Sequence, residues 1–196
     1  VPCYWVADFY SGLLHWVCDS YDLDESVMES GNIVSKIIYS ILGTVFDDFK
    51  LHHVKPNSIV GHNYVSLNGG IFMLTGIILT IVSIISMLFD TYTLGMKIFS
   101  ISILLTTQSN TFHRAAHSNN PPKFFKILQD YNLILTSERH RVHHKANNEL
   151  QGYTITSGHL NYFLDYINFR EKLENIIERR LNVKACRKLK LEENNN

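Results

Sequence analysis

The sequence has no surplus of either charge, because its 18 basic residues balance its 18 acidic residues. Proteins that bind nucleic acid carry a basic face, so this balance argues against a nucleic-acid partner. Cysteine is also scarce, and the three cysteines, Cys3, Cys18 and Cys186, lie far apart with no C-x-x-C pair. This spacing argues against a disulfide scaffold and against a zinc site built from thiolates.

The start of the chain lacks the basic residues that open a secretory signal peptide. It begins at Val1 rather than at a methionine, so we expect the domain to be incomplete at its N-terminus. The length of 196 residues fits one domain, which we place at residues 1–190. Residues 191–196 end in a run of asparagines, for which we expect a polar, disordered tail.

Long uncharged stretches, in contrast, are present in the middle of the chain. Residues 71–89 form a run of nineteen residues without a charge, which is long enough for a helix that crosses a bilayer. A short turn at residues 90–95 leads to a second predicted helix at residues 96–117, whose first half is apolar. We expect the two helices to form a hairpin that spans the membrane.

Basic residues are distributed unevenly about this predicted hairpin. Lys97 lies at its tip, whereas Arg114, Arg139 and several further lysines and arginines lie on the opposite side. Cytoplasmic segments of membrane proteins carry the excess of basic residues, so that side is predicted to face the cytosol. The apolar part of the hairpin contains no histidine, and we expect all histidines on the cytosolic side, just above the bilayer surface.

The other predicted elements are mostly helical. Residues 3–19 are nearly all apolar and suggest a helix in or against the membrane, in which Asp8 has a capping or packing role. An acidic connector at residues 20–31 leads to an amphipathic helix at residues 32–49. The charged stretch at residues 169–181 predicts a further helix. Together these segments predict an all-α membrane protein with a cytosolic, histidine-rich helical cap.

Two segments are predicted to be irregular. His62 and Asn68 are placed in a loop that Gly69 and Gly70 close. Turn-forming residues are frequent in residues 152–161, and His159, which stands alone in that segment, is assigned a structural role.

The histidines give the strongest indication of function, because eight of the ten fall into four groups. Residues three or four apart lie on one face of a helix, so the members of a group can approach one metal ion. Neutral imidazole is a good ligand for first-row transition metals. The four groups are His15 with Asp19, His52 with His53, His113 with His117, and His140 with His143 and His144.

Six stretches of the sequence follow one another in an order that is typical of one family. They are A-D-F-Y-S-G-L-L-H-W-V-C-D at 7–19, H-H-V-K-P at 52–56, F-H-R-A-A-H at 112–117, L-Q-D-Y at 128–131, H-R-V-H-H at 140–144 and T-S-G-H-L-N-Y at 156–162. On these stretches the chain resembles the Kua family of lipid desaturases, which contains plasmanylethanolamine desaturase. The resemblance covers most of the chain.

The resemblance implies an enzyme of the endoplasmic reticulum that introduces a double bond into a membrane phospholipid. The resemblance implies two iron ions as cofactor, dioxygen as co-substrate and a cytochrome b5-type protein as electron donor. Iron and dioxygen are needed because no side chain can oxidise an unactivated C–H bond. Asp19 is expected to bind metal or to orient an imidazole, and His62 to bind metal or substrate. The predicted metal-binding residues are His15, Asp19, His52, His53, His62, His113, His117, His140, His143 and His144.

Three arginines, Arg114, Arg139 and Arg141, are candidates for binding the lipid phosphate through paired hydrogen bonds. The alternative is that they are the surface charge of the cytosolic side. Asn68 and Asn161 are further candidates for contacting the substrate.

The substrate is predicted from smaller resemblances within the family. His62 and Asn68 followed by Gly69 resemble the branch that forms the vinyl ether of plasmalogens from plasmanylethanolamine, which we expect here. Ser137 and Arg139 resemble the plant-type branch, which desaturates the palmitoyl chain of phosphatidylglycerol. That activity, a membrane lipid hydroxylase and a non-enzymatic membrane metal-binding protein are the alternatives. The lack of histidine in the hairpin counts against a metal carrier.

Overall fold

The computed structural model describes residues 2–21, 29, 33–145 and 150–193. These residues form helices joined by irregular segments, with no β-strand among them, which confirms the all-α prediction. Most of the predicted acidic connector lies outside the described residues, as do residues 194–196 of the predicted tail. Residues 191–193 belong to the last helix, α11 (Cys186–Glu193).

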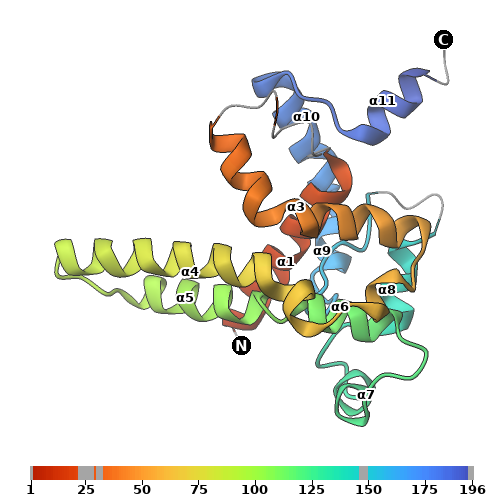
Figure 1. Ribbon diagram of the computed structural model, residues 1–196, viewed down its shortest axis with the longest axis horizontal. Coiled ribbons are helices and arrows are strands. Elements are labelled where there is room, and N and C mark those ends of the chain that lie inside the picture. The colour runs from red at the N-terminus through yellow and green to blue at the C-terminus, as the bar shows by residue number, and fades with distance from the viewer. Residues whose placement is uncertain (1, 22–28, 30–32, 146–149, 194–196) are drawn as a thin grey trace.

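A long apolar helix, α4 (Tyr64–Leu88), projects from one side of the protein (Figure 1). Within the described residues it is the one helix that is long and apolar enough to cross a membrane. Only 11% of its most apolar window is buried, whereas the core helix of a soluble protein would be mostly buried. Its length, composition and exposure therefore agree with a membrane span.

The loop predicted around Asn68 is wrong, because α4 begins upstream of it. Asn63 is the N-cap of α4, and its side chain accepts a hydrogen bond from the backbone N–H of Ser66 at 2.9 Å. A cap of this kind satisfies an N–H group that has no partner within the helix. Asn68 and the two glycines after it are helical, and a short 3-10 helix, η1 (Ser58–Gly61), precedes the cap.

The single helix predicted at residues 96–117 is also wrong, since it is divided into α5 (Leu94–Thr106) and α6 (Ser109–His117). Helix α5 lies beside α4 and has its most extensive contacts with α1 (Pro2–Ser20) (Figure 1). Its 13 residues extend about 20 Å at 1.5 Å per residue, which is less than the ~30 Å of a bilayer core. Length and composition thus support a span for α4 alone.

Helices α1 and α3 (Ile33–Val54) cross near the centre of the protein. Both agree with their predictions, and α3 continues far enough that His52 and His53 lie in its last turn. Four shorter helices complete the fold: α7 (Lys123–Asp130), α8 (Ser137–His143), α9 (Asn161–Tyr166) and α10 (Phe169–Leu181), the last with its predicted bounds. The apolar core consists of Cys18, Val45, Phe46, Phe49, Ile71, Ala116, Leu135 and Ile155.

Candidate metal centre

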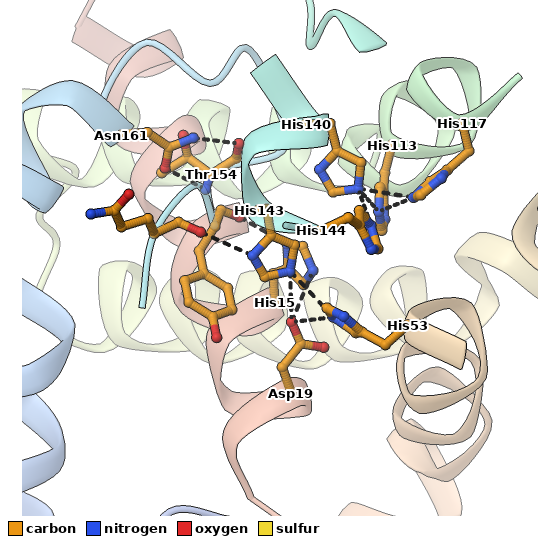
Figure 2. A network of polar contacts seen from close by, with 12 residues as sticks. His15, Asp19, His53, His113, His117, His140, His143, His144, Thr154 and Asn161 are labelled. Carbon is orange, nitrogen blue, oxygen red and sulfur yellow. Dashed lines mark hydrogen bonds and ion pairs between the residues drawn. The ribbon is translucent and has the colours of Figure 1, made fainter. Parts of the chain in front are cut away.

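Five histidines from α3, α6 and the end of α8 converge on one point, with their nearest nitrogens all within 4.8 Å of one another. In this five-histidine group, Nε2 of His140 lies 2.8 Å from Nε2 of His113 and 2.9 Å from those of His117 and His144 (Figure 2). Within the group, His113 with His117 and His140 with His144 are i, i+4 pairs, which lie on one face of a helix. The group comprises His52, His113, His117, His140 and His144.

Hydrogen bonds alone cannot satisfy this arrangement. The Nε2 atoms of His113, His117 and His140 form a triangle with sides of 2.8, 2.9 and 3.1 Å. Each Nε2 of a neutral imidazole is either a hydrogen-bond donor or an acceptor, so at least two of the three atoms have the same role. Two donors or two acceptors at this distance repel each other. Two nitrogens about 2.0–2.1 Å from a metal and at right angles are ~2.9 Å apart, so a cation among three lone pairs resolves the conflict.

A second group, of four residues, lies next to the first and contains the one carboxylate. Oδ2 of Asp19 lies 3.1 Å from Nε2 of His15, 2.9 Å from that of His53 and 3.2 Å from that of His143 (Figure 2). Neither oxygen of Asp19 has a hydrogen bond of regular geometry to a residue that the structure describes, although both are buried. Buried polar atoms without regular partners fit a group whose missing partner is a cation.

The two groups are direct neighbours. The ring centroids of His52 and His53 are 4.4 Å apart, and that of His15 lies 5.0 Å from that of His113. Each pair has one ring in each group. The donor set is eight imidazoles and one carboxylate, and no cysteine takes part. Such nitrogen and oxygen donors suit iron and other first-row metals.

Backbone carbonyls fix the orientation of two imidazoles in the four-residue group. Nδ1 of His15 lies 2.9 Å from the carbonyl oxygen of Tyr153, and Nδ1 of His143 lies 2.9 Å from that of Gln151. A carbonyl can only accept, so each Nδ1 carries the proton and each Nε2 keeps its lone pair. The lone pairs of both rings therefore face Asp19, as metal binding requires.

Burial favours the neutral form of several imidazoles in the two groups. Burial and the neighbouring imidazoles lower the pKa of His113 and His140 well below the ordinary value. The pKa of His117 and of His143 is lowered to about 4, in both cases mainly by burial. At neutral pH His113, His117, His140 and His143 are thus neutral, the protonation state in which imidazole binds metals.

Asp8 of α1 holds the segment at residues 154–160, which follows α8. The sequence did not reveal these partners of Asp8. The carboxylate of Asp8 accepts hydrogen bonds from the backbone N–H groups of Ser157, Gly158 and Leu160 at 2.7, 3.2 and 3.1 Å, and from the hydroxyl of Thr154 at 3.2 Å. Asp8 is buried, so its predicted packing role is confirmed and made specific. Through this segment Asp8 holds the carbonyls that orient the histidines.

Two glycines allow the close packing that this arrangement needs. A Cβ at Gly12 of α1 would lie 2.6 Å from a methyl carbon of Thr154. Gly152 has φ +78°, a conformation that L side chains rarely adopt, and a Cβ there would lie 2.9 Å from Cβ of His143. A side chain at either position would push the segment away from the site.

The two remaining histidines, His62, which was predicted to bind metal or substrate, and His159, which was assigned a structural role, lie apart from both groups. His62 has Nε2 3.3 Å from Oδ1 of Asp48 and belongs to neither group. His159 also belongs to neither, and its ring lies 6.5 Å from that of Trp5. The structure thus brings together nine of the ten predicted metal-binding residues and leaves out His62.

The candidate substrate residues are mostly engaged with the protein itself. Arg114 donates from Nε to the carbonyl of Val60, and Arg139 from Nη1 to that of Ser157, both at 3.1 Å. A guanidinium has five N–H groups, so donors remain on each. Arg141 is exposed. A role for these arginines in binding phosphate stays a prediction.

The two asparagines are buried rather than open to a ligand. Asn161 accepts a hydrogen bond from the backbone N–H of Thr154 at 2.8 Å and thereby supports the segment held by Asp8 (Figure 2). Asn68 donates to the hydroxyl of Thr111 at 3.1 Å and so ties α4 to α6. These contacts give both side chains a structural task.

An apolar cavity of about 130 Å³ lies beside the metal centre. It is bounded by α1, α3, α4 and α6, and by Ile155 from the segment after α8. Its lining residues are Ser11, Leu14, Val17, Cys18, Val45, Phe46, Phe49, Ile71, Ser109, Asn110 and Ile155. The Phe49 ring connects the cavity with the histidines, since its centroid lies 4.8 Å from that of His15.

The fold and the site together define a class of helical proteins in which a histidine-rich candidate metal centre adjoins an apolar cavity and a helix fit to span a membrane. Within it, the chain belongs to the lipid desaturase family, because the family model described as the lipid desaturase domain matches residues 4–188. This confirms the resemblance found in the sequence.

Curated relatives carry two kinds of name. The chain is 29% identical over 186 residues to plasmanylethanolamine desaturase 1 of Mus musculus, covering 88% of this chain and 61% of that protein. It is 28% identical to plasmanylethanolamine desaturase of Myxococcus xanthus (89% and 57% covered) and to the chloroplastic fatty acid desaturase 4 of Arabidopsis thaliana (92% and 51%). The chain thus spans roughly half to three-fifths of these relatives. No solved structure matches it.

Proposed function

We propose that the protein is a membrane lipid desaturase in which the five-histidine group and the four-residue group each bind one iron ion. The observation that supports this most directly is the convergence of eight imidazoles and Asp19 in two neighbouring groups, several of whose polar atoms are buried without a partner, in a chain of the lipid desaturase family. Bound iron would activate dioxygen, the oxidant that attack on an unactivated C–H bond requires. In the overall reaction, dioxygen would take up two hydrogens from the lipid chain, two electrons from a donor and two protons. The products would be the double bond and two molecules of water.

The residues of the chain supply orientation and exclusion of water. The carbonyls of Gln151 and Tyr153 keep the lone pairs of His143 and His15 directed at the metal position. The anionic Asp19 offsets part of the metal's positive charge in a buried place. The apolar cavity receives a stretch of hydrocarbon, so the C–H bonds to be broken lie beside the histidines and away from water.

As the substrate we propose plasmanylethanolamine, with a vinyl ether lipid as the product. Two relatives with this name support the proposal, and so does His62, which resembles the histidine of that branch. The alternative is desaturation of an acyl chain, supported by the relative named fatty acid desaturase 4 and by Ser137 and Arg139. A cytochrome b5-type protein is the proposed electron donor in either case.

We further propose that α4 crosses the membrane of the endoplasmic reticulum with the metal centre on the cytosolic side. The helix has the length and exposure of a span. Lys97 follows its C-terminal end, whereas most of the basic residues are expected on the side of its N-terminal end, which is therefore proposed to face the cytosol. The metal centre then lies close to the bilayer surface, where a lipid chain can reach it.

The test is expression of the full-length parent protein in cells that lack plasmalogens, followed by mass spectrometry of their lipids. We expect vinyl ether lipids to return with the unaltered protein and not with His144→Ala. New unsaturation in acyl chains alone would favour the acyl desaturase, and hydroxylated lipids would favour a hydroxylase. Metal analysis of the purified protein separates these from a metal carrier, for which zinc without iron is expected.

A further inference from the structure

The cavity and the metal centre are built on the same helices, one turn apart. Ser11 precedes His15 by one turn of α1, Phe49 precedes His52 and His53 by one turn of α3, and Ser109 precedes His113 by one turn of α6. The lining residue and the histidine of each helix therefore lie on adjoining parts of one face. The cavity thus lies about one helical turn from the histidines on each of these three helices, and its position is fixed by the helices that position them.

The cavity is suited to hydrocarbon, because its polar lining groups are already satisfied. The hydroxyl of Ser11 donates to the carbonyl of Asp8, and that of Ser109 donates to the carbonyl of Thr106. The side-chain amide of Asn110 donates to the carbonyl of Leu67. The rest of the lining is apolar, and an apolar cavity of about 150 Å³ in another protein stays dry and binds benzene.

One lining residue contacts both metal-binding groups. The ring centroid of Phe49 lies 4.8 Å from that of His15, which belongs to the four-residue group. It lies 5.4 Å from that of His113, on which it is stacked, and 5.3 Å from that of His52, both in the five-histidine group. Phe49 is 6% exposed, so its ring fills the space between the cavity and the junction of the two groups.

We infer that Phe49 is a positioning residue that decides which carbon of a hydrocarbon chain in the cavity reaches the metal centre. This inference rests on the proposed function, because it takes the occupant of the cavity to be a segment of the lipid substrate. The ring is the surface against which the chain stops, and its size sets the distance between the chain and the histidines. A smaller side chain lets the chain come closer, and a larger one holds it farther away.

Phe46 provides a matched control on the same helix. It lines the same cavity and is 5% exposed, but no ring contact between Phe46 and a histidine occurs in the described part of the chain. Changes at Phe46 and Phe49 remove comparable apolar volume from one cavity. Only the change at Phe49 alters the surface that faces the metal centre.

The experiment uses the iron-loaded, full-length protein in detergent micelles with phosphatidylcholines that carry a nitroxide at successive carbons of one chain. Relaxation of the nitroxide by the paramagnetic iron identifies the labelled carbon that lies nearest to the metal centre. The variants are Phe49→Leu, Phe49→Trp and Phe46→Leu. Iron content is measured for each, so that a variant that has lost the metal is recognised.

We expect a clear maximum in the unaltered protein, a shift of that maximum in one direction along the chain for Phe49→Leu, and a shift in the opposite direction for Phe49→Trp. Phe46→Leu should keep the original position. The inference about Phe49 is overturned if both Phe49 variants keep iron and the original maximum, while the proposed function stands. If no label position in the iron-loaded unaltered protein shows enhanced relaxation, the chain does not reach the centre and the proposed function itself fails.

Discussion

At the scale of single residues, the metal centre depends on which nitrogen of each imidazole is free. The sequence predicted nine of the residues that the structure brings together, since i, i+4 pairs on helices are visible without coordinates. It did not reveal the carbonyls of Gln151 and Tyr153, because a backbone carbonyl leaves no trace in residue type. It also did not reveal that His62 pairs with Asp48, since sequence alone gave no distance between them.

The central position of His140 in the five-histidine group leads to a prediction. Its Nε2 lies within 2.9 Å of three other Nε2 atoms, so His140→Ala should remove a donor shared by the whole group. We expect metal affinity at this group to fall by more than about 100-fold, since changes that merely orient a ligand cost 10–100-fold. Iron per chain after dialysis against a chelator measures this. His159→Ala is the control, and full iron retention by His140→Ala would contradict the five-histidine group.

At the scale of the elements, propensity and hydropathy predicted most helices but not where the second apolar helix breaks. The break lies at a cluster of hydroxyl residues, and Thr106, Thr107 and Ser109 donate to the carbonyls of Ser102, Leu104 and Thr106 at 2.9, 2.7 and 2.7 Å. Such side chains compete with the hydrogen bonds of the helix. The sequence T-T-Q-S contained this signal, but the apolar residues before it and the i, i+4 pair of His113 and His117 after it favoured one continuous helix.

The segment that Asp8 holds on α1 gives a prediction at the same scale. Asp8→Asn replaces an acceptor oxygen with an N–H donor that faces other N–H donors, so the segment and the carbonyls on it should loosen. We expect iron affinity in the four-residue group to fall 10–100-fold while the five-histidine group keeps its metal. Chelator titration followed by iron analysis measures both sites.

Asp130→Asn is the matched control for this change. Asp130 is exposed, and its carboxylate pairs with Lys126 of the same helix. If Asp8→Asn lowers the unfolding temperature but leaves both iron affinities unchanged, Asp8 supports the fold without orienting the site.

At the scale of the whole molecule, the proposed membrane placement depends on α4. The run of uncharged residues predicted this span, and the exposure of its apolar side chains agrees with it. The predicted hairpin depended on a second span, which α5 is too short to provide. The break that shortens α5 was missed in the sequence, and its contacts with α1 are tertiary and leave no sequence signal.

A charge in the middle of α4 tests this placement. Ile81 is exposed on α4, so Ile81→Lys should place a charge among lipid chains at a cost of about 2.5–3.5 kcal/mol. We expect a smaller share of the protein to stay in membranes after alkaline extraction. Leu181→Lys, at an exposed position of α10, should have no effect. Equal extraction of the two variants would argue against α4 as a span.

The neutral, buried histidines make the metal-free protein sensitive to acid. The pKa of His117 and of His143 is lowered from 6.5 to about 4. Above pH 6.5 both are neutral whether the protein is folded or unfolded, so they add no pH dependence there. Between pH 6.5 and about 4 only the unfolded chain takes up protons, so stability falls with pH by roughly 1 kcal/mol per unit for each group.

Thermal unfolding of the metal-free protein in micelles, from about pH 7 to about pH 5, measures this effect. We expect the midpoint temperature to fall as the pH falls, and to fall less steeply in His143→Gln. A midpoint that does not change over this interval would mean that the histidines are not buried in the metal-free state.

The residues of the four-residue group are also far apart in the order of synthesis. The carbonyl of Tyr153, which orients His15, follows it by 138 residues. A growing chain on the ribosome therefore has His15 and Asp19 available long before His143 and the carbonyls that complete the group. Under the proposed function, this group can capture iron only after translation has passed Tyr153 and the segment has folded back on α1. Metal loading would then be a late event in biogenesis, and a nascent chain released early would leave the ribosome without metal.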